Sequence, residues 1–389
     1  MKDCAEKFYN YFFNARTVLN SPRLAWIDYA KGLTIILVVY HHSYLTLTNA
    51  GVHVNSWLIN ANVLVYSFRM PMFFILSGLF IERGLQKRGV KKYIKYRIRY
   101  LLYPYILWTS IQLTTKLFFS QYMISPWGLK GYLFIFYQPN ATAQFWYLIT
   151  LFNTALLFVI LSSLFNLNPK YQFILGILLY MASPFLSFNS MIQDTTRFYG
   201  YLVFGVLISK FILSKDNFRL YSSVRLFVPL LLLMIFSQYY LFKHQYLYLL
   251  EVNVNIEHSS FNSIIIHFWG MLKFIGIVII GCAFVLNSCA LFQRLGKATF
   301  IRIIGFHSLY IYIMHVIICV GIRILLVNLL HYENAFVILP LQIFCGMVGS
   351  VMIYNICKRL HLNFLFEYDV AELKIFFFKI RSGLQLQNA

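Results

Sequence analysis

The chain has 389 residues, of which 60% are hydrophobic and only 12% are charged. Soluble domains carry about 25% charged residues, so this composition excludes an ordinary soluble protein and predicts one that crosses a membrane several times. The 33 basic and 12 acidic residues give a formal charge of +21. No recognised nucleic-acid-binding module accompanies that charge, so we expect no nucleic-acid partner; basic loops that contact anionic membrane lipids explain it.

Runs of about 20 mostly apolar residues predict ten membrane-spanning helices and therefore an all-α transmembrane bundle. The predicted spans are 32–50, 60–82, 99–120, 145–165, 171–188, 197–214, 224–243, 263–286, 307–328 and 335–357. They divide the chain into a cytoplasmic N-terminal segment 1–24, a ten-span membrane domain 25–357 and a cytoplasmic C-terminal tail 358–389.

The distribution of basic residues predicts the orientation of these spans. Residues 83–99, between spans two and three, contain eight lysines and arginines. Further basic residues lie between spans six and seven, before span nine and after span ten, whereas the alternate loops 51–59 and 244–262 contain none. Because basic loops stay in the cytoplasm, both termini are predicted to be cytoplasmic.

The first span carries ionisable residues, which are costly inside a membrane. In "WIDYAKGLTIILVVYHHSYLTL", Asp28 and Lys31 precede the apolar run, and His41 and His42 follow it. At about 100° per residue, positions eleven apart return to within about 20°, so Lys31 and His42 share a helix face, about 16 Å apart. Asp28 lies near that face, but His41 points about 80–100° away. The spacing therefore predicts a polar stripe that ends at His42 and that need not include His41.

Later spans also contain ionisable residues. A single one is most simply a hydrogen-bonded structural residue, or a snorkelling one near the outer face, which is the interpretation we favour for His267 and Arg323. Several together predict a hydrated or polar cavity within the bundle. The residues are Arg69 in span two, His267 and Lys273 in span eight, and His315 and Arg323 in span nine.

Five segments in chain order carry a family resemblance. They are Lys31–ten residues–His42, "FRMPMFFILSG" (68–78), "KYRIRYLLYPYILW" (95–108), "FWYLITLF" (145–152) and "IIGFHSLYIYIMH" (303–315). Together they resemble the acyltransferase-3 family of membrane O-acyltransferases over about residues 24–357, and the first segment looks most like the fucose O-acetylase-like branch. Two departures stand out: Lys31 replaces the usual Arg, which keeps the charge but loses the bidentate geometry, and no Arg-x-x-Arg pattern is present near span three.

The resemblance implies transfer of an acyl group, usually acetyl from acetyl-CoA, to a hydroxyl of a surface or lipid-linked carbohydrate. It also implies a location in a bacterial inner membrane and gives no reason to expect a metal. Histidine is the usual base for such a hydroxyl because its pKa lies near neutrality, so His42 is the predicted catalytic base. Lys31 and Asp28, nearer the cytoplasmic mouth, are predicted to orient the donor.

The remaining candidate residues have weaker support. The cluster Lys95, Arg97 and Arg99 is predicted to bind the CoA phosphates, while the run 83–92 could equally be purely topogenic. Arg69 has two open interpretations: it stabilises the tetrahedral oxyanion, or it pairs structurally with a polar neighbour. The predicted cavity or substrate residues are His315, Trp146 and Lys273, and Trp146 is also compatible with an interface anchor. Further candidates for sugar contacts are Asp194, Arg197, Glu251 and Glu257.

Two other function classes fit the composition. One is a transporter of an acyl-carrying or polar solute, although no inverted repeat is visible in the sequence. The other is a non-catalytic family member that serves in glycan assembly or sensing, which the presence of both Lys31 and His42 disfavours. Hydrolysis of acyl-CoA by the purified protein would separate the acyltransferase from both alternatives.

Overall fold

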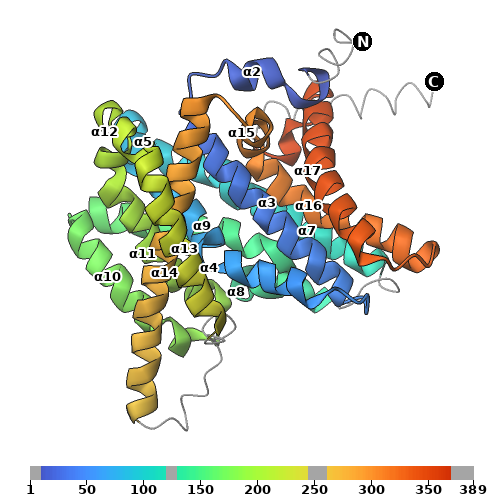
Figure 1. Cartoon of the computed structure of the whole chain (residues 1–389), viewed down its shortest axis with the longest axis horizontal. Helices are drawn as coiled ribbons and strands as arrows, with labels where there is room; N and C mark the ends of the chain where they lie inside the picture. Colours follow the sequence, from blue (N-terminus) through green and yellow to red (C-terminus); the bar gives the residue numbers. More distant parts are fainter. Residues whose placement is uncertain (1–9, 120–128, 244–260, 369–389) are drawn as a thin grey trace.

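The computed structural model describes residues 10–119, 129–243 and 261–368, with backbone alone for 261–267 and Ala143. Within these ranges the chain is helical and contains no strand, as the predicted all-α class requires (Figure 1). The first half contains α2 (Ala15–Leu19), α3 (Ala25–Thr48), α4 (Ser56–Gly78), α5 (Ile81–Arg88), α6 (Val90–Arg97), η1 (Ile98–Leu102), α7 (Tyr103–Phe118), η3 (Leu129–Leu133), α8 (Phe134–Tyr137), η4 (Pro139–Phe145), α9 (Trp146–Ser163), α10 (Pro169–Ala182) and η5 (Ser183–Leu186).

The second half continues the bundle with longer helices, and it ends in a short turn that follows the last of them. Its elements are α11 (Ser190–Ile212), α12 (Lys215–Tyr221), α13 (Val224–Lys243), α14 (Phe261–Leu295), α15 (Thr299–Phe306), α16 (Ser308–Arg323), η8 (Ile324–Leu329), α17 (Ala335–Arg359) and η9 (Asn363–Leu365).

Each of the ten predicted spans overlaps one of these helices. In the described ranges, six helices are long and apolar enough to cross a membrane, and α11 with α12, bent by 105°, gives a seventh. Helix α10 has 14 residues, which is too short to cross a membrane. Helix α3 is long enough, but polar residues near both of its ends lower its mean hydropathy. The prediction of a helical, membrane-crossing fold is therefore confirmed. The count of ten spans and the cytoplasmic location of the termini stay predictions.

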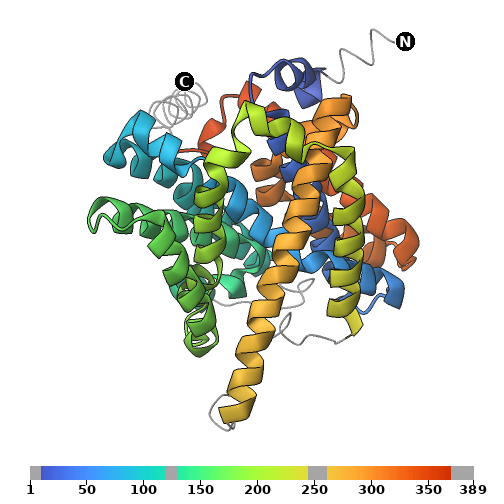
Figure 2. The ribbon, with the colours of Figure 1, turned by 60° about the vertical axis from the view of Figure 1, so that its left-hand side comes forward.

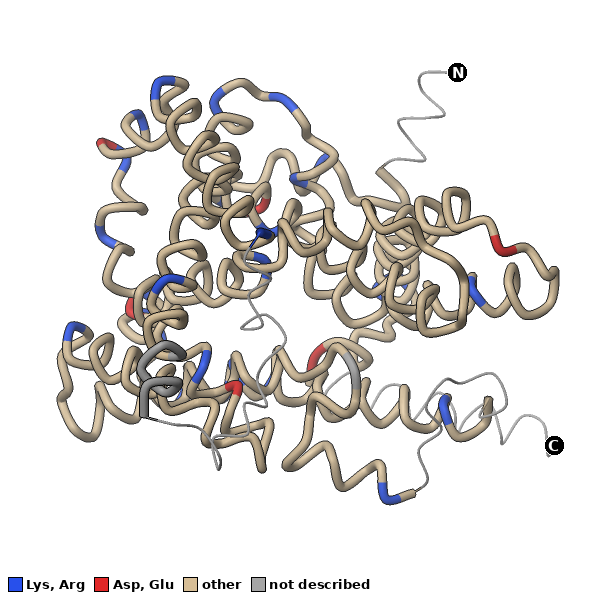
Figure 3. The backbone as a smooth tube through the Cα atoms, turned by 60° about the horizontal axis from the view of Figure 1, so that its bottom comes forward, with Lys and Arg blue, Asp and Glu red and all other residues tan. Residues whose placement is uncertain are grey.

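One end of the bundle is formed by α5, α6, α12, α15 and the C-terminal end of α17, and we call it the basic end (Figures 1 and 2). Lysines and arginines far outnumber acidic residues along the described backbone (Figure 3). Some of them tie segments of this end together: Arg302 donates to the Leu19 carbonyl at 3.1 Å and Arg359 to the Tyr11 carbonyl at 2.6 Å. The predicted basic loops thus gather at one end, as the positive-inside rule expects.

Helix α3 lies at the centre of the bundle and packs against α4, α14, α15, α16 and α17. Its neighbour α4 also packs against α11 and α13, and α11 in turn contacts α9 and α10. Because helices surround α3, its polar side chains face protein rather than lipid. This position explains how the helix carries ionisable groups that lipid would not tolerate.

Glycines allow two of these helix pairs to approach closely. A Cβ atom at Gly305 of α15 would overlap the Asp28 carbonyl of α3, and one at Gly205 of α11 would overlap the Ile75 carbonyl of α4. Small residues at crossings of membrane helices let the backbones approach in this way. The contacts fix α15 beside the start of α3 and fix α11 beside the end of α4.

The first part of the predicted C-terminal tail packs against α7 and η1. Trp108 donates its indole hydrogen to the Leu365 carbonyl at 2.6 Å, and the Tyr103 hydroxyl donates to the Phe364 carbonyl at 2.8 Å. Residues 363–368 are therefore part of the folded bundle, at its basic end.

Candidate active site

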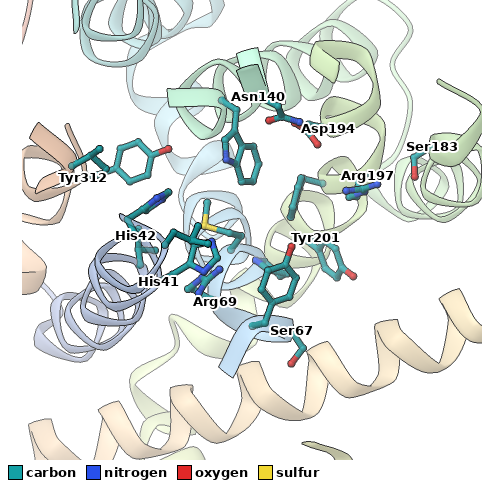
Figure 4. A pocket seen from close by; sticks show the side chains of 18 of the residues that line it. His41, His42, Ser67, Arg69, Asn140, Ser183, Asp194, Arg197, Tyr201 and Tyr312 are labelled. Carbon is teal, nitrogen blue, oxygen red and sulfur yellow. The ribbon is translucent and has the colours of Figure 1, made fainter. Parts of the chain in front are cut away.

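A cavity of about 540 Å³ lies inside the half of the bundle that is remote from the basic end. Its lining residues fall within 38–49 on α3, 66–71 on α4 and 194–201 on α11, and α7, α9, α14 and α16 supply others. Ligand pockets usually measure about 300–1,000 Å³, so this volume suits a small-molecule substrate. Figure 4 shows the histidines of α3 on one side of the space and residues of α11 on the other.

His41 and His42 of α3 both line this cavity, and their ring centroids are 5.2 Å apart. The spacing argument singled out His42 and left His41 aside. In the structure the cavity extends over both faces of this turn, because its walls come from α4 and α16 as well as from α3. His41 also contacts Tyr44 and Tyr66 edge to face.

His315 of α16 lies behind His42 and does not itself line the cavity. The two ring centroids are 5.2 Å apart, and the His315 side chain is fully buried. Its Nδ1 lies 2.8 Å from the Ile311 carbonyl and 3.0 Å from the Tyr312 carbonyl. A carbonyl only accepts hydrogen bonds, so Nδ1 carries the hydrogen and Nε2 keeps its lone pair. No partner for Nε2 is found among the described residues.

Arg69 of α4 has surroundings that fit both interpretations given above: it has a polar structural neighbour, and it also borders the cavity, where it could meet an oxyanion. It is 3% exposed, and its Nη1 donates to the Asn62 side-chain oxygen at 3.0 Å, so it has a polar structural neighbour. Its guanidinium carbon also lies 5.1 Å from the centroid of the Tyr66 ring, and the residue lines the cavity. No carboxylate of the described chain lies within 4.0 Å of it, so its positive charge is available to the cavity.

Lys31 and Asp28 lie near the basic end of α3 and do not line the cavity. Asp28 is 4% exposed, and one of its oxygens lies 3.9 Å from the Arg302 side chain. Lys31 is half-buried, eleven residues before His42 and so about 16 Å away along the axis. The structure therefore places the predicted donor-orienting residues and the predicted base in two separate places on one helix.

The predicted phosphate-binding cluster also lies outside the cavity, at the start of η1. Lys95 is exposed, and Arg97 donates to the Tyr93 hydroxyl at 2.8 Å. Arg99 forms an ion pair with Glu367 at 3.2 Å, so part of its charge is already compensated.

Two further predicted residues differ in their surroundings. Trp146, the first residue of α9, lines the cavity and packs 5.4 Å from the Phe198 ring centroid. Lys273 of α14 is exposed on the outside of the bundle and is not part of the lining. Glu251 and Glu257 lie outside the described residues.

The sequence reasoning did not single out Lys116 of α7, Tyr201 of α11 or Tyr312 of α16, all of which line the cavity. A lysine inside a predicted span is a signal that could have found Lys116. The two tyrosines carry no such signal, because aromatic residues make up 19% of the chain. Asp194 and Arg197, which were candidates for sugar contacts, line the wall that α11 forms.

In residues 10–119, 129–243 and 261–368, no group of three histidines, cysteines or acidic residues is arranged to hold a metal ion. The described cavity groups are imidazoles, three guanidiniums, an ammonium group, hydroxyls and a carboxylate, which suit proton transfer and binding of polar ligands.

Comparison with known proteins adds the family. Residues 24–355 match the family described as an acyltransferase domain. No curated protein and no solved structure matches the chain. The match covers most of the 389 residues and includes the helices that form the cavity. Together with the apolar helices, it shows that the chain is a membrane acyltransferase of the acyltransferase-3 family.

Proposed function

We propose that the protein is an O-acetyltransferase of a bacterial inner membrane, which moves an acetyl group from cytoplasmic acetyl-CoA to a hydroxyl of a surface or lipid-linked carbohydrate. The observation that carries the proposal is the placement of His42 on the cavity wall with His315 behind it and Arg69 nearby. The resemblance to the fucose O-acetylase-like branch supports the choice of acetyl donor and sugar acceptor.

In this mechanism His42 is the general base. A neutral imidazole has one nitrogen that donates and one that accepts a proton. The fixed lone pair of His315 Nε2 favours the His42 tautomer whose N–H faces His315, which leaves the other nitrogen for the acceptor. His315 thus acts as a positioning residue, in the way that a third group orients the base in other acyl-transfer enzymes.

The reaction then follows ordinary acyl-transfer chemistry. His42 takes the proton of the sugar hydroxyl as the oxygen attacks the thioester carbon, and the carbonyl oxygen becomes an oxyanion. Arg69 stabilises this oxyanion with its uncompensated charge. The carbon–sulfur bond breaks, the protonated His42 returns its proton to the CoA thiolate, and an O-acetyl ester remains on the sugar.

The donor approaches from the basic end. Lys31 and Asp28 orient it, and Lys95, Arg97 and Arg99 are the cations that this proposal assigns to the CoA phosphates. Since Lys31 and His42 are about 16 Å apart along α3, the phosphates and the thioester of one extended donor can occupy the two places together.

The test is consumption of acetyl-CoA by the purified protein, given a crude glycan fraction as acceptor, with O-acetyl product measured by mass spectrometry. We expect His42→Ala to lower the rate about 10³-fold, because removal of a general base typically costs between 10² and 10⁴.

His53→Ala is the matched control, because His53 is exposed in the loop after α3 and does not line the cavity. Wild-type rates in both variants, with protein yield unchanged, would exclude His42 as the base. A folded wild type that neither binds nor consumes acetyl-CoA would contradict the acetyltransferase and favour a transporter.

A further inference from the structure

The wall of the cavity opposite the histidines has no role in the mechanism above. It contains Asp194 and Arg197 of α11, Trp146 of α9 and Lys116 of α7. In Figure 4, Asp194 and Arg197 lie across the space from His41 and His42. We call these four residues the acceptor wall.

Asp194 gives this wall a buried acceptor that a polar ligand can use. Its side chain is 3% exposed, and its Oδ2 atom has no hydrogen-bond partner in the described chain. The charge of Arg197 and the side chain of Asn140 both interact with the carboxyl group, although no described cation lies within ion-pair distance of it. An unpaired buried acceptor is costly, and the hydroxyls of a sugar would satisfy it.

Positive charge dominates the cavity lining. Among the described residues, four basic side chains and one acidic one line it. The side chains of Lys116 and Arg197 form no ion pair or hydrogen bond within the part of the chain that the structure describes. The four basic residues are Arg69, Lys116, Arg197 and Arg323.

The position of these cations matters as much as their number. Lys116, Arg197 and Arg323 lie toward the ends of their helices that are remote from the basic end, where the positive-inside rule gives no reason to place them. Intramembrane charges that face a cavity commonly mark substrate or ion pathways, and cations in such a place suit an anionic ligand. The aromatic face of Trp146 beside them suits the apolar face of a sugar ring.

We propose that the acceptor wall binds a sugar that carries an anionic group, either a carboxylate or a phosphate. Asp194 accepts hydrogen bonds from its hydroxyls, Trp146 contacts its ring, and Lys116 and Arg197 neutralise its charge. This inference rests on the proposed function for the name acceptor, but the binding itself requires no acyl transfer.

The experiment measures binding through thermal stability, since a ligand that binds the folded state raises its midpoint. The probes are glucuronate, glucose 1-phosphate and neutral methyl glucoside, each given to detergent-solubilised protein, with sodium chloride added to equal ionic strength. We expect one or both anionic sugars to raise the midpoint by about 2 °C near tenfold saturation, and methyl glucoside to raise it less.

In the double variant Lys116→Gln/Arg197→Gln the shift with the anionic sugars should disappear. It should persist in Lys130→Gln, the matched control, because Lys130 is exposed and does not line the cavity. Acetyl-CoA should stabilise all three proteins equally, since its phosphates are assigned to the basic end.

The response to glucuronate or to glucose 1-phosphate identifies which anionic group is preferred. Equal stabilisation by methyl glucoside, no stabilisation by either anionic sugar, or a lost shift in Lys130→Gln would overturn the proposal. So would loss of the acetyl-CoA shift in the double variant, because the cavity cations would then bind the donor.

Discussion

His307 and His315 invite comparison because their local structure is the same. They lie eight residues apart, one between α15 and α16 and the other within α16, and both are fully buried. In each, Nδ1 lies close to the carbonyl four residues earlier, at 2.9 Å and 2.8 Å respectively, and within the described chain each Nε2 has no partner.

Their surroundings differ. His307 lies near the basic end, where the rings of Phe306 and Tyr354 pack against it. His315 lies behind His42, which in turn lines the cavity. The backbone bond fixes the same tautomer in both, but of the two only His315 lies beside another imidazole among the described residues, that of His42. The chemical role of a buried histidine therefore depends on the side chains that pack against its ring. The local sequence does not determine which side chains these are.

The sharpest test of this comparison replaces each histidine by glutamine. We expect His315→Gln to lower kcat for acetyl transfer about 10- to 100-fold, because the tautomer of His42 is no longer selected. His307→Gln should change kcat less than about twofold, since it touches no reacting group.

The measurement is steady-state release of CoA, together with the KM for acetyl-CoA and the thermal midpoint. A positioning role predicts a lower kcat with KM and midpoint close to those of His307→Gln. If the midpoint of His315→Gln falls in parallel with kcat, the role of His315 is structural and the comparison fails.

A second prediction concerns the close contact at the basic end. Gly305→Ala places a methyl group where the Asp28 carbonyl lies, so α15 must shift away from α3. Overpacking of this kind typically lowers the free energy of unfolding by about 1–3 kcal/mol.

Gly321→Ala in α16 is its control, because a Cβ there meets no atom within 4 Å. The thermal unfolding midpoint of Gly321→Ala should stay within about 2 °C of that of the wild type. The measurement compares the midpoints of both variants and the wild type in the same detergent. Equal midpoints for the two variants would show that the α3–α15 contact is not tight.

The smallest effects are expected at the donor site, where Lys31 and Arg99 differ in their partners. Loss of one charge-assisted hydrogen bond to the donor raises KM about tenfold, which we expect for Lys31→Gln. Arg99 is partly exposed and already paired with Glu367, so Arg99→Gln should raise the KM for acetyl-CoA less than about twofold. Donor titrations check both values, and a larger increase for Arg99→Gln than for Lys31→Gln would show that the Glu367 pair does not weaken the contribution of Arg99 to donor binding.

The sequence located the helices well, because apolar runs of membrane length are a strong signal. It also identified the face of α3 that holds Lys31 and His42, since helical spacing is regular. It left His41 aside although His41 lines the cavity, because which faces of a central helix meet a cavity depends on how its neighbours cross it.

The pairing of Arg99 with Glu367 was equally beyond reach, since 268 residues separate the two. The tautomer of His315 follows from carbonyls of its own helix, but its relation to His42 depends on how α3 packs against α16. Periodicity within one helix says nothing about such crossings.

The glycine contact between α4 and α11 has a mechanical consequence. Gly205 and Ile75 lie in the halves of these helices nearer the basic end, whereas Arg69 lies near the middle of α4 and Arg197 lies in the other half of α11. Backbones that touch cannot slide past each other without collision. This crossing therefore fixes how far apart α4 and α11 hold Arg69 and Arg197, and with them the width of the cavity that these two helices border.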